Sequence, residues 1–369
     1  MTTTSYPVNH PLAVKLWGVR MLREALKETY VSRFMGKPGD TNALIYVKNE
    51  LNKSSGDRIR IPLRMQLTGQ GIVGDGTLEG NEEALVTYSD DLLIDQLGHA
   101  VRSSGEMSEQ RVPHSVREEA VDGLRDWWAD RIDTSFFNQA AGDTSVSQTY
   151  AGMNLPTAPT GTASPTNCRI IYGSGSTSTT TSLTASSSNS ASIRGLFFNT
   201  AALDVALNLA KIASPMIRPL RINGQSKYVC FVHPNQARYM RQTNTANVVT
   251  WYDVMRARVE GGEKDNPLYN GALGEYNGVI LHESTRVPAP TASGNANFRR
   301  AVFCGAQAVS FGTGQRDRDV KMKWTEELFD YENQLGVAAR MIWGMKKMVF
   351  NSIDFGSLVI QTYAPPPAV

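Results

Sequence analysis

The sequence predicts an α+β fold for this chain of 369 residues. Segments with a helical spacing of apolar residues and segments with strand alternation follow one another without a regular βαβ repeat, which disfavours a doubly wound parallel sheet. At one domain per roughly 150 residues, the length allows two or three structural units with cores of their own. The chain starts without the pattern of a signal peptide and has no apolar run long enough for a membrane helix, so we expect no membrane contact.

Composition narrows the possible functions. Lys and Arg total 37 against 35 for Asp and Glu, and this net charge of +2 disfavours a protein held on nucleic acid chiefly by phosphate neutralisation. The cysteines, Cys168, Cys230 and Cys304, have no paired spacing, which disfavours a disulfide framework or a zinc ribbon and suits a reducing cytoplasm. The histidines are dispersed and no nucleophile elbow occurs, so we expect no metal, no cofactor and no enzymatic activity. An enzyme whose site is assembled from residues distant in the sequence is the alternative that these patterns leave open.

The first predicted element is one amphipathic helix from about Leu12 to Phe34, which belongs to an N-terminal arm of residues 1–41. Its apolar residues recur near helical spacing after Pro11, a favourable residue in a first turn. The helix carries more basic than acidic side chains. The basic residues singled out are Lys15, Arg20, Arg23 and Lys27. They form either a weak contact surface for a nucleic acid backbone or an ordinary solvated face.

A long hairpin is predicted next, within residues 42–105. Polar and apolar residues alternate strictly over residues 58–67, and Pro62 marks an edge strand. The apolar face of this strand comprises Ile59, Ile61, Leu63, Met65 and Leu67. Residues 84–96 form the returning strand. Because a two-stranded hairpin is marginal in water, we expect its apolar face to be covered from outside, for example by another copy of the chain.

The tip between these strands is rich in glycine and acid. It contains Gly69, Gly71, Gly74, Gly76 and Gly80, with Asp75, Glu79, Glu82 and Glu83. Residues 69–74 match the dinucleotide-binding spacing G-x-G-x-x-G, but further glycines and acids follow where a helix should hold a phosphate. The acids are hard oxygen donors of the kind that bind Ca²⁺, yet their spacing is not that of an EF-hand. We therefore predict a solvated or partner-facing tip.

A strong helix is predicted from the capping-box residues Ser115 and Glu118 to about Ala141. Its apolar residues fall at intervals of four: Val116, Ala120, Leu124, Trp128, Ile132 and Phe136. The adjacent pairs Trp127–Trp128 and Phe136–Phe137 fit a core, although aromatic pairs also stack on bases. This helix should be the backbone of the main domain.

Residues 144–194 are predicted to be a Ser/Thr-rich surface insertion, because 14 of the 19 residues from Ser174 to Ser192 are Ser or Thr. The elements expected after it are a helix over 196–213, a buried strand over 227–232, helices over 236–242 and 251–259, a turn and strand over 274–282, one interrupted strand over 300–311, and strands or mixed structure over 320–349 and 357–363. His233, before Pro234, is predicted to be a turn or helix-entry residue and not a catalytic base.

Several stretches together resemble the major capsid proteins of tailed bacteriophages, specifically the N-four-like family, whose fold is the Hong Kong 97 type. The resembling residues are 67–69, 74–75, 78–83, 95–96, 101–102, 107–111, 127–131 and 136–138. The dense part of the resemblance covers about residues 44–142, and residues 274–287 resemble the family more loosely.

The resemblance implies an arm over 1–41, an extended hairpin loop over 42–105 that lies on a neighbouring subunit, and a peripheral domain over 106–143 with a spine helix. After the insertion over 144–194 come an axial domain over 195–309 and, over 310–369, return strands of the peripheral domain and a C-terminal tail. The residues expected to contact a neighbour are Ile59, Ile61, Leu63, Met65, Leu67, Gly69, Gly71, Gly74, Asp75, Glu79, Glu82 and Glu83.

The implied function is self-assembly, as hexamers and pentamers, into an icosahedral shell that encloses phage double-stranded DNA. The implied partners are other copies of the chain, a portal, cement or scaffold proteins, and packaged DNA touched weakly through Lys15, Arg20, Arg23 and Lys27. The protein would be made in the cytoplasm of the bacterial host and reside in the virion. A shell-decorating or tail protein of a virion is the alternative.

Overall fold

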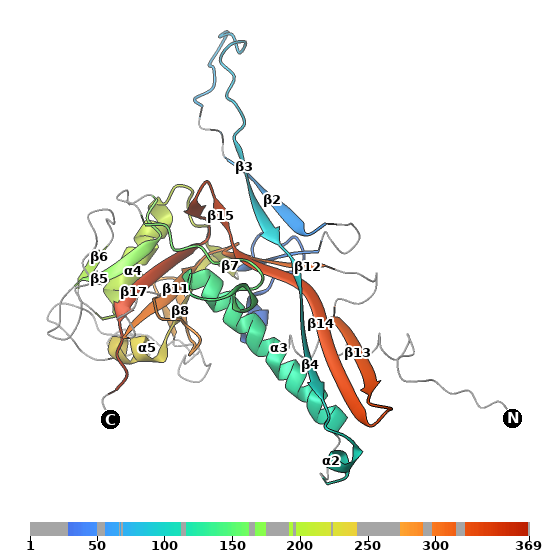
Figure 1. The fold of residues 1–369 in the computed structure, drawn as a ribbon. Helices are drawn as coiled ribbons and strands as arrows, with labels where there is room; N and C mark the ends of the chain where they lie inside the picture. Colours follow the sequence, from blue (N-terminus) through green and yellow to red (C-terminus); the bar gives the residue numbers. More distant parts are fainter. Residues whose placement is uncertain are drawn as a thin grey trace.

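The computed structural model describes residues 29–49, 56–65, 67, 69–111, 116–161, 167–174, 192–194, 197–222, 224–241, 274–290, 297–314 and 322–367. Two large sheets and one long helix organise this part of the chain, and a hairpin projects from it (Figure 1). The prediction of an α+β fold is confirmed. Within the described part, no helix is both long enough and apolar enough to cross a membrane.

A five-stranded sheet is built around one long strand. It contains β1 (Ile45–Lys48), β4 (Asp95–Arg102), β12 (Val309–Gly314), β13 (Met322–Phe329) and β14 (Gln334–Lys347). β14 pairs antiparallel with β4 along one edge and with β13 and β12 along the other, while β1 extends the sheet parallel to β12. Alternate residues of β14 from Val337 to Met345 are buried in one core.

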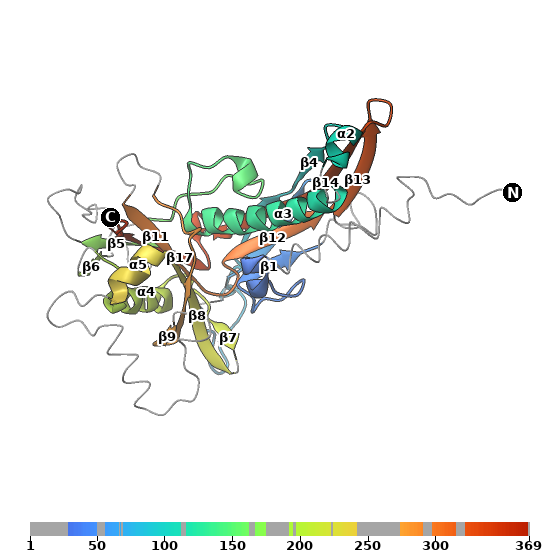
Figure 2. The ribbon, with the colours of Figure 1, turned by 90° about the horizontal axis from the view of Figure 1, so that it is seen from below.

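The helix α3 (Val116–Ala141) covers one face of this sheet (Figure 2). The predicted spacing is confirmed, because Leu124, Trp128 and Phe136 are fully buried. The indole of Trp128 packs edge-on against Trp343 of β14, with ring centroids 6.4 Å apart. The core interpretation of these aromatic residues is therefore right, and the long helix stabilises the fold by burying large apolar area. Ser115 of the predicted capping box lies outside the described residues.

An eight-stranded sheet forms the second layer. Its strands, in spatial order, are β6 (Ser192–Arg194), β5 (Ile170–Ser174), β17 (Ser357–Tyr363), β11 (Phe298–Cys304), β8 (Gln225–Val232), β10 (Val279–Glu283) and β9 (Gly274–Tyr276), and β7 (Leu220–Ile222) also pairs with β8. Helices α4 (Thr200–Ile212) and α5 (Pro234–Arg241) accompany it. The side chain of His233 accepts a hydrogen bond from the N–H of Asn235 at the start of α5, which confirms its role at the helix entry.

The three cysteines are free and buried. Burial raises the pKa of the Cys230 and Cys304 thiols far above the ordinary value, so these groups are inert core residues. The described structure has no disulfide, in agreement with the spacing argument.

The predicted single strand over 300–311 is wrong. It is two strands, β11 and β12, which belong to different sheets and are separated at residues 305–308. At Gly305 a Cβ atom would collide with the carbonyl oxygen of Arg218, so glycine is needed where the chain passes from one sheet to the other. The sequence is an almost continuous apolar run through this crossing because both strands are buried, which hides the change of sheet.

Two predicted domain assignments also need correction. β17 was expected to return to the peripheral domain, but it pairs with β11 and β5 in the eight-stranded sheet, and all its residues are buried. The predicted surface insertion over 144–194 includes buried segments, among them Ala151, Asn154 and Ile171. Composition misleads here because the Ser/Thr-rich run, most of which lies outside the described residues, adjoins strand β5 of the sheet interior.

The arm differs from its prediction as well. Residues 1–28, with most of the predicted helix, lie outside the described residues, as does the predicted helix over 251–259. Thr29 is extended, and Tyr30–Phe34 form a short 3₁₀ helix, η1, so one helix does not continue to Phe34. The carboxylate of Asp133 on α3 accepts hydrogen bonds from the backbone N–H groups of Tyr30 and Val31, each at 3.0 Å. This tertiary contact fixes the turn in place of a further α-helical turn.

Four short elements complete the described chain. They are α2 (Glu106–Gln110), a 3₁₀ helix over Gln148–Tyr150, and the paired strands β15 (Val349–Phe350) and β16 (Ile353–Asp354).

An aromatic cage around His282 predicts acid-sensitive stability. Rings of Phe34, Tyr30 and Phe231 lie 5.2, 6.3 and 5.9 Å from the His282 ring, and burial, with a smaller effect of Arg33, lowers the pKa of His282 to about 4. The unfolded chain has the ordinary histidine pKa of about 6.5, so it binds more protons than the folded chain between these values. Stability present above pH 6.5 is therefore lost as the pH falls toward 4.

We expect the urea midpoint of unfolding to fall between about pH 7 and pH 5, and to fall less in His282→Phe, which keeps the ring but cannot bind a proton. Between about pH 7 and pH 8, above the titration window, the two proteins should respond alike. An equal drop at pH 5 in both proteins would contradict this assignment.

Candidate inter-subunit surfaces

The predicted hairpin is present and consists of β2 (Arg58–Arg64) and β3 (Thr87–Leu93). The strands are antiparallel, with Arg58 opposite Leu93 and Arg64 opposite Thr87. The predicted returning strand over 84–96 is divided, because β4 begins at Asp95 and joins the five-stranded sheet. Residues 69–86, named the hairpin tip below, project away from both sheets (Figure 1).

The base of the hairpin is covered by its own chain, which corrects one prediction. Ile59 is 2% exposed and packs with Leu92, Ile94 and Ile342. Ile61 is 5% exposed and lies in a cluster with Met348, Phe350 and Phe355. The apolar cover of these two residues therefore comes from their own chain and not from a neighbouring copy. The alternation correctly predicted an apolar face, but it could not identify the cover, which is supplied by residues almost 300 positions further along the chain.

Glycines make room for this contact on the sheet face opposite α3. A Cβ at Gly312 would lie 2.8 Å from both Ile59 Cδ1 and Leu92 Cδ2, and a Cβ at Gly344 would collide with the carbonyl oxygen of Leu93. Because Gly312 and Gly344 have no side chains, the apolar side chains of the hairpin base and the backbone of Leu93 lie directly on the sheet. A larger residue at either position would lift the hairpin from its support.

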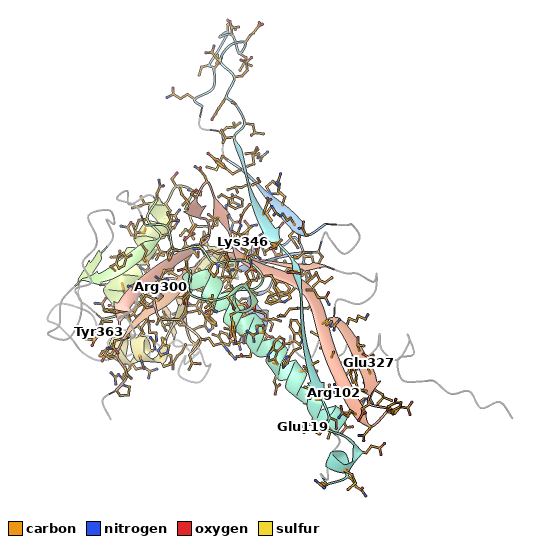
Figure 3. All side chains as sticks on the ribbon, in the orientation of Figure 1. Arg102, Glu119, Arg300, Glu327, Lys346 and Tyr363 are labelled. Carbon is orange, nitrogen blue, oxygen red and sulfur yellow. The ribbon has the colours of Figure 1, made fainter. Side chains whose placement is uncertain are left out.

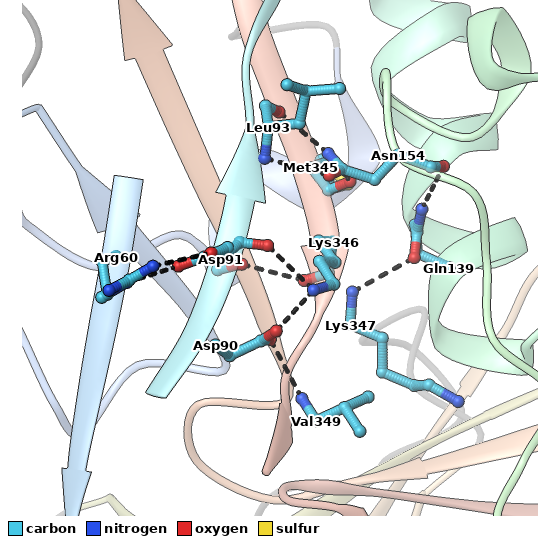
Figure 4. Close-up of polar contacts among 11 residues, drawn as sticks. Arg60, Asp90, Asp91, Leu93, Gln139, Asn154, Met345, Lys346, Lys347 and Val349 are labelled. Atoms are coloured by element: carbon cyan, nitrogen blue, oxygen red, sulfur yellow. Dashed lines mark hydrogen bonds and ion pairs between the residues drawn. The ribbon is translucent and has the colours of Figure 1, made fainter. Parts of the chain in front are cut away.

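Charged groups fix the hairpin base in register (Figure 4). Asp90 of β3 forms an ion pair with Lys346 and accepts a hydrogen bond from the N–H of Val349 at 3.2 Å. Lys346 also donates to the carbonyl oxygen of Asp91 at 2.8 Å. On the outer side, a hydrogen bond from Arg60 is the main cause that lowers the pKa of Asp91, which stays ionised. Asp90 and Lys346 thus tie β3 to the end of β14, and the ion pair between Arg60 and Asp91 ties β2 to β3.

Polar side chains also link the hairpin base to α3. Asn154 bridges the backbones of β3 and β14: it accepts a hydrogen bond from Leu93 N–H at 3.0 Å and donates to Leu93 O at 3.0 Å and Met345 O at 3.1 Å. Gln139 of α3 donates to Asn154 O and accepts from Lys347 N–H (Figure 4). No feature of the sequence predicts these residues, because a lone Asn or Gln carries no local pattern. Their burial within a chain of hydrogen bonds makes the hairpin continuous with the spine helix.

Lys347, at the end of β14, is a buried charged residue whose polar partners lie in its own chain. Its side chain is 1% exposed, and its ammonium group forms an ion pair with Asp354 at 2.9 Å and donates to Thr157 O at 3.0 Å. A buried charge is tolerated only when it is paired and hydrogen-bonded in this way.

The hairpin tip, in contrast, has little contact with its own chain. Val73 is 94% exposed, Leu78 is 68% exposed and Leu85 is 58% exposed. Gly71, Gly74 and Gly80 have φ values of 71°, 68° and 89°, a region that glycine enters without strain. No helix follows Gly74, so the reading as a hairpin tip is confirmed over the dinucleotide-binding reading.

The acids of the tip fall into two groups. Glu82 and Glu83 accept hydrogen bonds from the N–H groups of Gly80 and Gly69, at 2.8 and 2.7 Å, and so shape the loop. Asp75 and Glu79 are exposed, and within the described residues they form no hydrogen bond or ion pair. The tip therefore presents two free carboxylates beside exposed apolar side chains.

The remaining predicted site residues are placed as follows. Leu63 and Met65 are half-buried and Leu67 is 56% exposed, so the strand becomes accessible toward the tip. Lys15, Arg20, Arg23 and Lys27 lie outside the described residues. Among the residues that the structure describes, no group of His, Cys, Asp and Glu side chains is arranged to hold a metal ion.

Comparisons with known proteins agree along almost the whole chain. A family model described as phage capsid protein matches residues 5–366. The major capsid protein of Pseudomonas phage KPP25 is 31% identical over 376 residues, which cover 94% of each chain. The capsid of Ralstonia phage GP4 is similar in structure, with a TM-score of 0.72, 29% identity and 92% coverage of each chain. The cyanophage Pam1 capsid, at 21% identity, has a TM-score of 0.68 over 93% of this chain and 94% of that chain, and supports the fold alone.

An Asp substitution at one buried and one exposed position tests whether the hairpin base is covered by its own chain while the hairpin tip is not. Ile61→Asp places a carboxylate in an apolar cluster and should lower the free energy of unfolding by more than about 3 kcal/mol. Val73→Asp, at a position that is 94% exposed, should change it by less than about 0.5 kcal/mol. Urea unfolding of the unassembled subunits measures both values. Equal destabilisation by the two substitutions would refute the division.

Proposed function

The chain belongs to the phage capsid protein family, and from this premise we propose how its copies join. It is a major capsid protein, a structural subunit of the Hong Kong 97 type whose copies associate into the shell of a phage virion. In the proposed arrangement the copies form hexamers and pentamers, and these build an icosahedral shell around double-stranded DNA. The hairpin tip of each copy contacts an adjacent copy.

The main support for a contact between copies is the set of exposed apolar side chains on the hairpin tip. Val73 and Leu78 lie on a loop that reaches beyond the body of its own chain (Figure 1). Apolar side chains gathered on a projecting loop are typical of a protein interface. Obligate interfaces commonly bury about 2,000 Å² or more, and a long loop adds contact area at little cost in chain length. Positive-φ glycines suit a tip that meets neighbours at the slightly different angles of hexamers and pentamers.

We also propose which partners the subunit meets and where it is made. The subunit works without a cofactor and without enzymatic activity, is made in the cytoplasm of the bacterial host, and meets a portal and cement or scaffold proteins in the virion. Packaged DNA touches the basic arm weakly. The motifs between residues 44 and 142 support membership of the N-four-like branch of the family.

Assembly should depend on the apolar tip. We expect the overexpressed chain to form shells, seen by negative-stain microscopy and sedimentation, and Val73→Asp combined with Leu78→Asp to yield folded subunits that form none. The charges would have to be buried in the interface without a partner. Val73→Ile with Leu78→Ile keeps the apolar area and should assemble.

Three outcomes would contradict the proposed contact or function. Shells of normal yield from the double Asp variant would refute the tip contact. A wild-type chain that stays monomeric at every concentration would count against self-assembly. One copy per several shell subunits in purified virions would favour a decorating protein.

The basic arm gives a separate expectation. Lys15 and Lys27 should resist an amine-reactive reagent in intact DNA-filled particles, react once the particles are opened, and react further after nuclease treatment, because phosphates then no longer cover them. Mass spectrometry of the labelled peptides measures each step. Labelling of intact particles, or no change after nuclease, would refute a DNA-facing arm.

A further inference from the structure

One side of α3 carries a row of exposed carboxylates. The row, named the acidic face below, consists of Glu118, Asp122, Asp126 and Asp130. These residues recur at intervals of four and therefore follow one side of the helix. The side chains of Asp122, Asp126 and Asp130 are 63%, 69% and 63% exposed. Figure 3 shows how long a surface the helix offers, because Glu119 and Arg300 are labelled near its opposite ends.

Two cations beside the acidic face neutralise only part of it. Arg125 lies 3.3 Å from Asp122 and 3.9 Å from Asp126, and Arg286 lies 2.8 Å from Asp130. Four carboxylates against these two cations leave an excess of two negative charges on this side of the helix.

The acidic face does not serve the stability of α3 itself. Like charges at i and i+4 destabilise a helix, and the helix dipole favours acids in the first turn and not in the middle. Gly123, within the same stretch, lowers the helix propensity, and a Cβ atom there would meet no atom within 4 Å. Carboxylates beside open space suit a second polypeptide segment that brings cations and approaches α3 closely.

The N-terminal arm meets α3 where the acidic face ends. Asp133, three residues after Asp130, accepts hydrogen bonds from the backbone N–H groups of Tyr30 and Val31 through its two carboxylate oxygens. The side chain of Asp133 is only 3% exposed, in contrast to that of Asp130. Residues 1–28, which lie outside the described residues, therefore join the chain beside the last carboxylate of the acidic face.

The hydrogen bond between Tyr30 and Asp133 fixes the level at which the arm meets α3. It joins positions that are 103 apart in the chain. Thr29 is extended, so the helix that the sequence predicts in the arm ends before this residue and can follow α3 back toward Val116. Two parallel helices rise equally, by about 1.5 Å per residue, so the offset of 103 then holds along both.

At this offset the cations of the arm fall level with the carboxylates of α3. The positions 103 residues after the arm cations are 118, 123, 126 and 130, and the cations are Lys15, Arg20, Arg23 and Lys27. Three of these positions are Glu118, Asp126 and Asp130. The fourth is adjacent to Asp122, about 1.5 Å away along the helix axis.

The acids of the arm agree with the same offset. Arg131 of α3 lies with its guanidinium group 4.9 and 3.9 Å from the ring centres of Trp127 and Tyr150, and its buried Nε and Nη1 atoms have no hydrogen-bond partner among the described residues. Glu28 falls level with this arginine, and Glu24 falls level with the uncharged Trp127. The offset thus gives a carboxylate to a cation of α3 as well as cations to its carboxylates.

We propose that residues 12–28 of the arm dock along the acidic face of their own chain, as a helix parallel to α3. Each cation of the arm pairs with the carboxylate at its own level, for example Arg23 with Asp126. The docked arm neutralises a surface that repels packaged DNA. Exposed ion pairs are weak and screened by salt, so phosphates compete for the same cations once DNA is present. The docking therefore concerns the subunit before DNA enters, and it rests neither on the tip contact nor on the DNA contact proposed above.

A cysteine pair tests the register in unassembled subunits free of DNA. Under a mild oxidant, two thiols form a disulfide only when their Cα atoms approach within about 7 Å. Arg23→Cys with Asp126→Cys should link the subunit to itself, which mass spectrometry detects as two peptides joined by a disulfide. The matched control, Arg23→Cys with Glu119→Cys, moves the second thiol by two helical turns, or about 10 Å, and should stay reduced. The native cysteines are buried and should not compete.

A charge exchange tests the pairing. Arg20→Glu combined with Arg23→Glu should raise the hydrogen–deuterium exchange of the arm at least about fivefold, because the arm then repels α3. Adding Asp122→Arg and Asp126→Arg should return the exchange to within about twofold of the wild type, since each ion pair is rebuilt with its charges reversed. A merely structural effect of the first two substitutions would not be rescued by changes on α3.

A control variant separates pairing from net charge. Lys211→Glu with Arg218→Glu changes the net charge by the same amount at two exposed positions and should leave the exchange of the arm unchanged. The thermal midpoint of each unassembled variant shows that it is folded.

The outcomes separate this proposal from those on assembly and DNA. No disulfide between positions 23 and 126, equal linking by the Glu119→Cys control, or no rescue by the charge exchange would overturn the docking. Disulfide-linked dimers would assign the arm to another copy and overturn docking on its own chain. All of these measurements use DNA-free subunits, so a failure to form shells or an unchanged amine labelling after nuclease would count against the other proposals alone.

Discussion

The contact between the hairpin base and the sheet face at Gly312 and Gly344 is the constraint on which the rest of the structure depends. A two-stranded hairpin alone is marginal in water, so this long hairpin needs support at its base. Here the backbone of β3 lies against glycines, and the ion pair between Asp90 and Lys346 fixes its register. The polar bridge from Asn154 to Gln139 continues the support to α3. The tip can therefore project far from the body while its direction stays fixed.

Contacts between the two sheets hold together the body that carries this hairpin. The chain crosses between the two sheets at Gly305, and a single core cluster includes Phe231 and Val302 of one sheet together with Trp343 of the other. Asp133 of α3 also binds the backbone of the arm at Tyr30 and Val31, so the beginning of the described chain is tied to the same helix. Adjustment between neighbouring copies must then fall on parts with few contacts, and the glycine-rich tip is such a part.

The net charge of +2 conceals a separation of charge along the molecule. Acids gather at the hairpin tip, whereas Arg102, Lys323 and Arg340, which form no ion pair within the described residues, lie on the five-stranded sheet. Such a separation has little effect on the folding of one subunit, because exposed charges at this spacing are screened by salt.

By itself the sequence determined the local structure: the apolar spacing of α3 from Val116 to Ala141, the alternation of β2, the glycine-rich tip and the helix entry at His233 all appear in the fold. The resemblance over residues 44–142 also predicted a phage major capsid protein, and the match to the phage capsid protein family confirms this. Only the tertiary structure decided which surface covers each apolar face. It placed Ile61 against Phe350 of its own chain, assigned β17 to the eight-stranded sheet, and divided residues 298–314 between two sheets. The physical reason is that periodicity records whether a side chain is buried, whereas the identity of its cover depends on long-range contacts that no local pattern encodes.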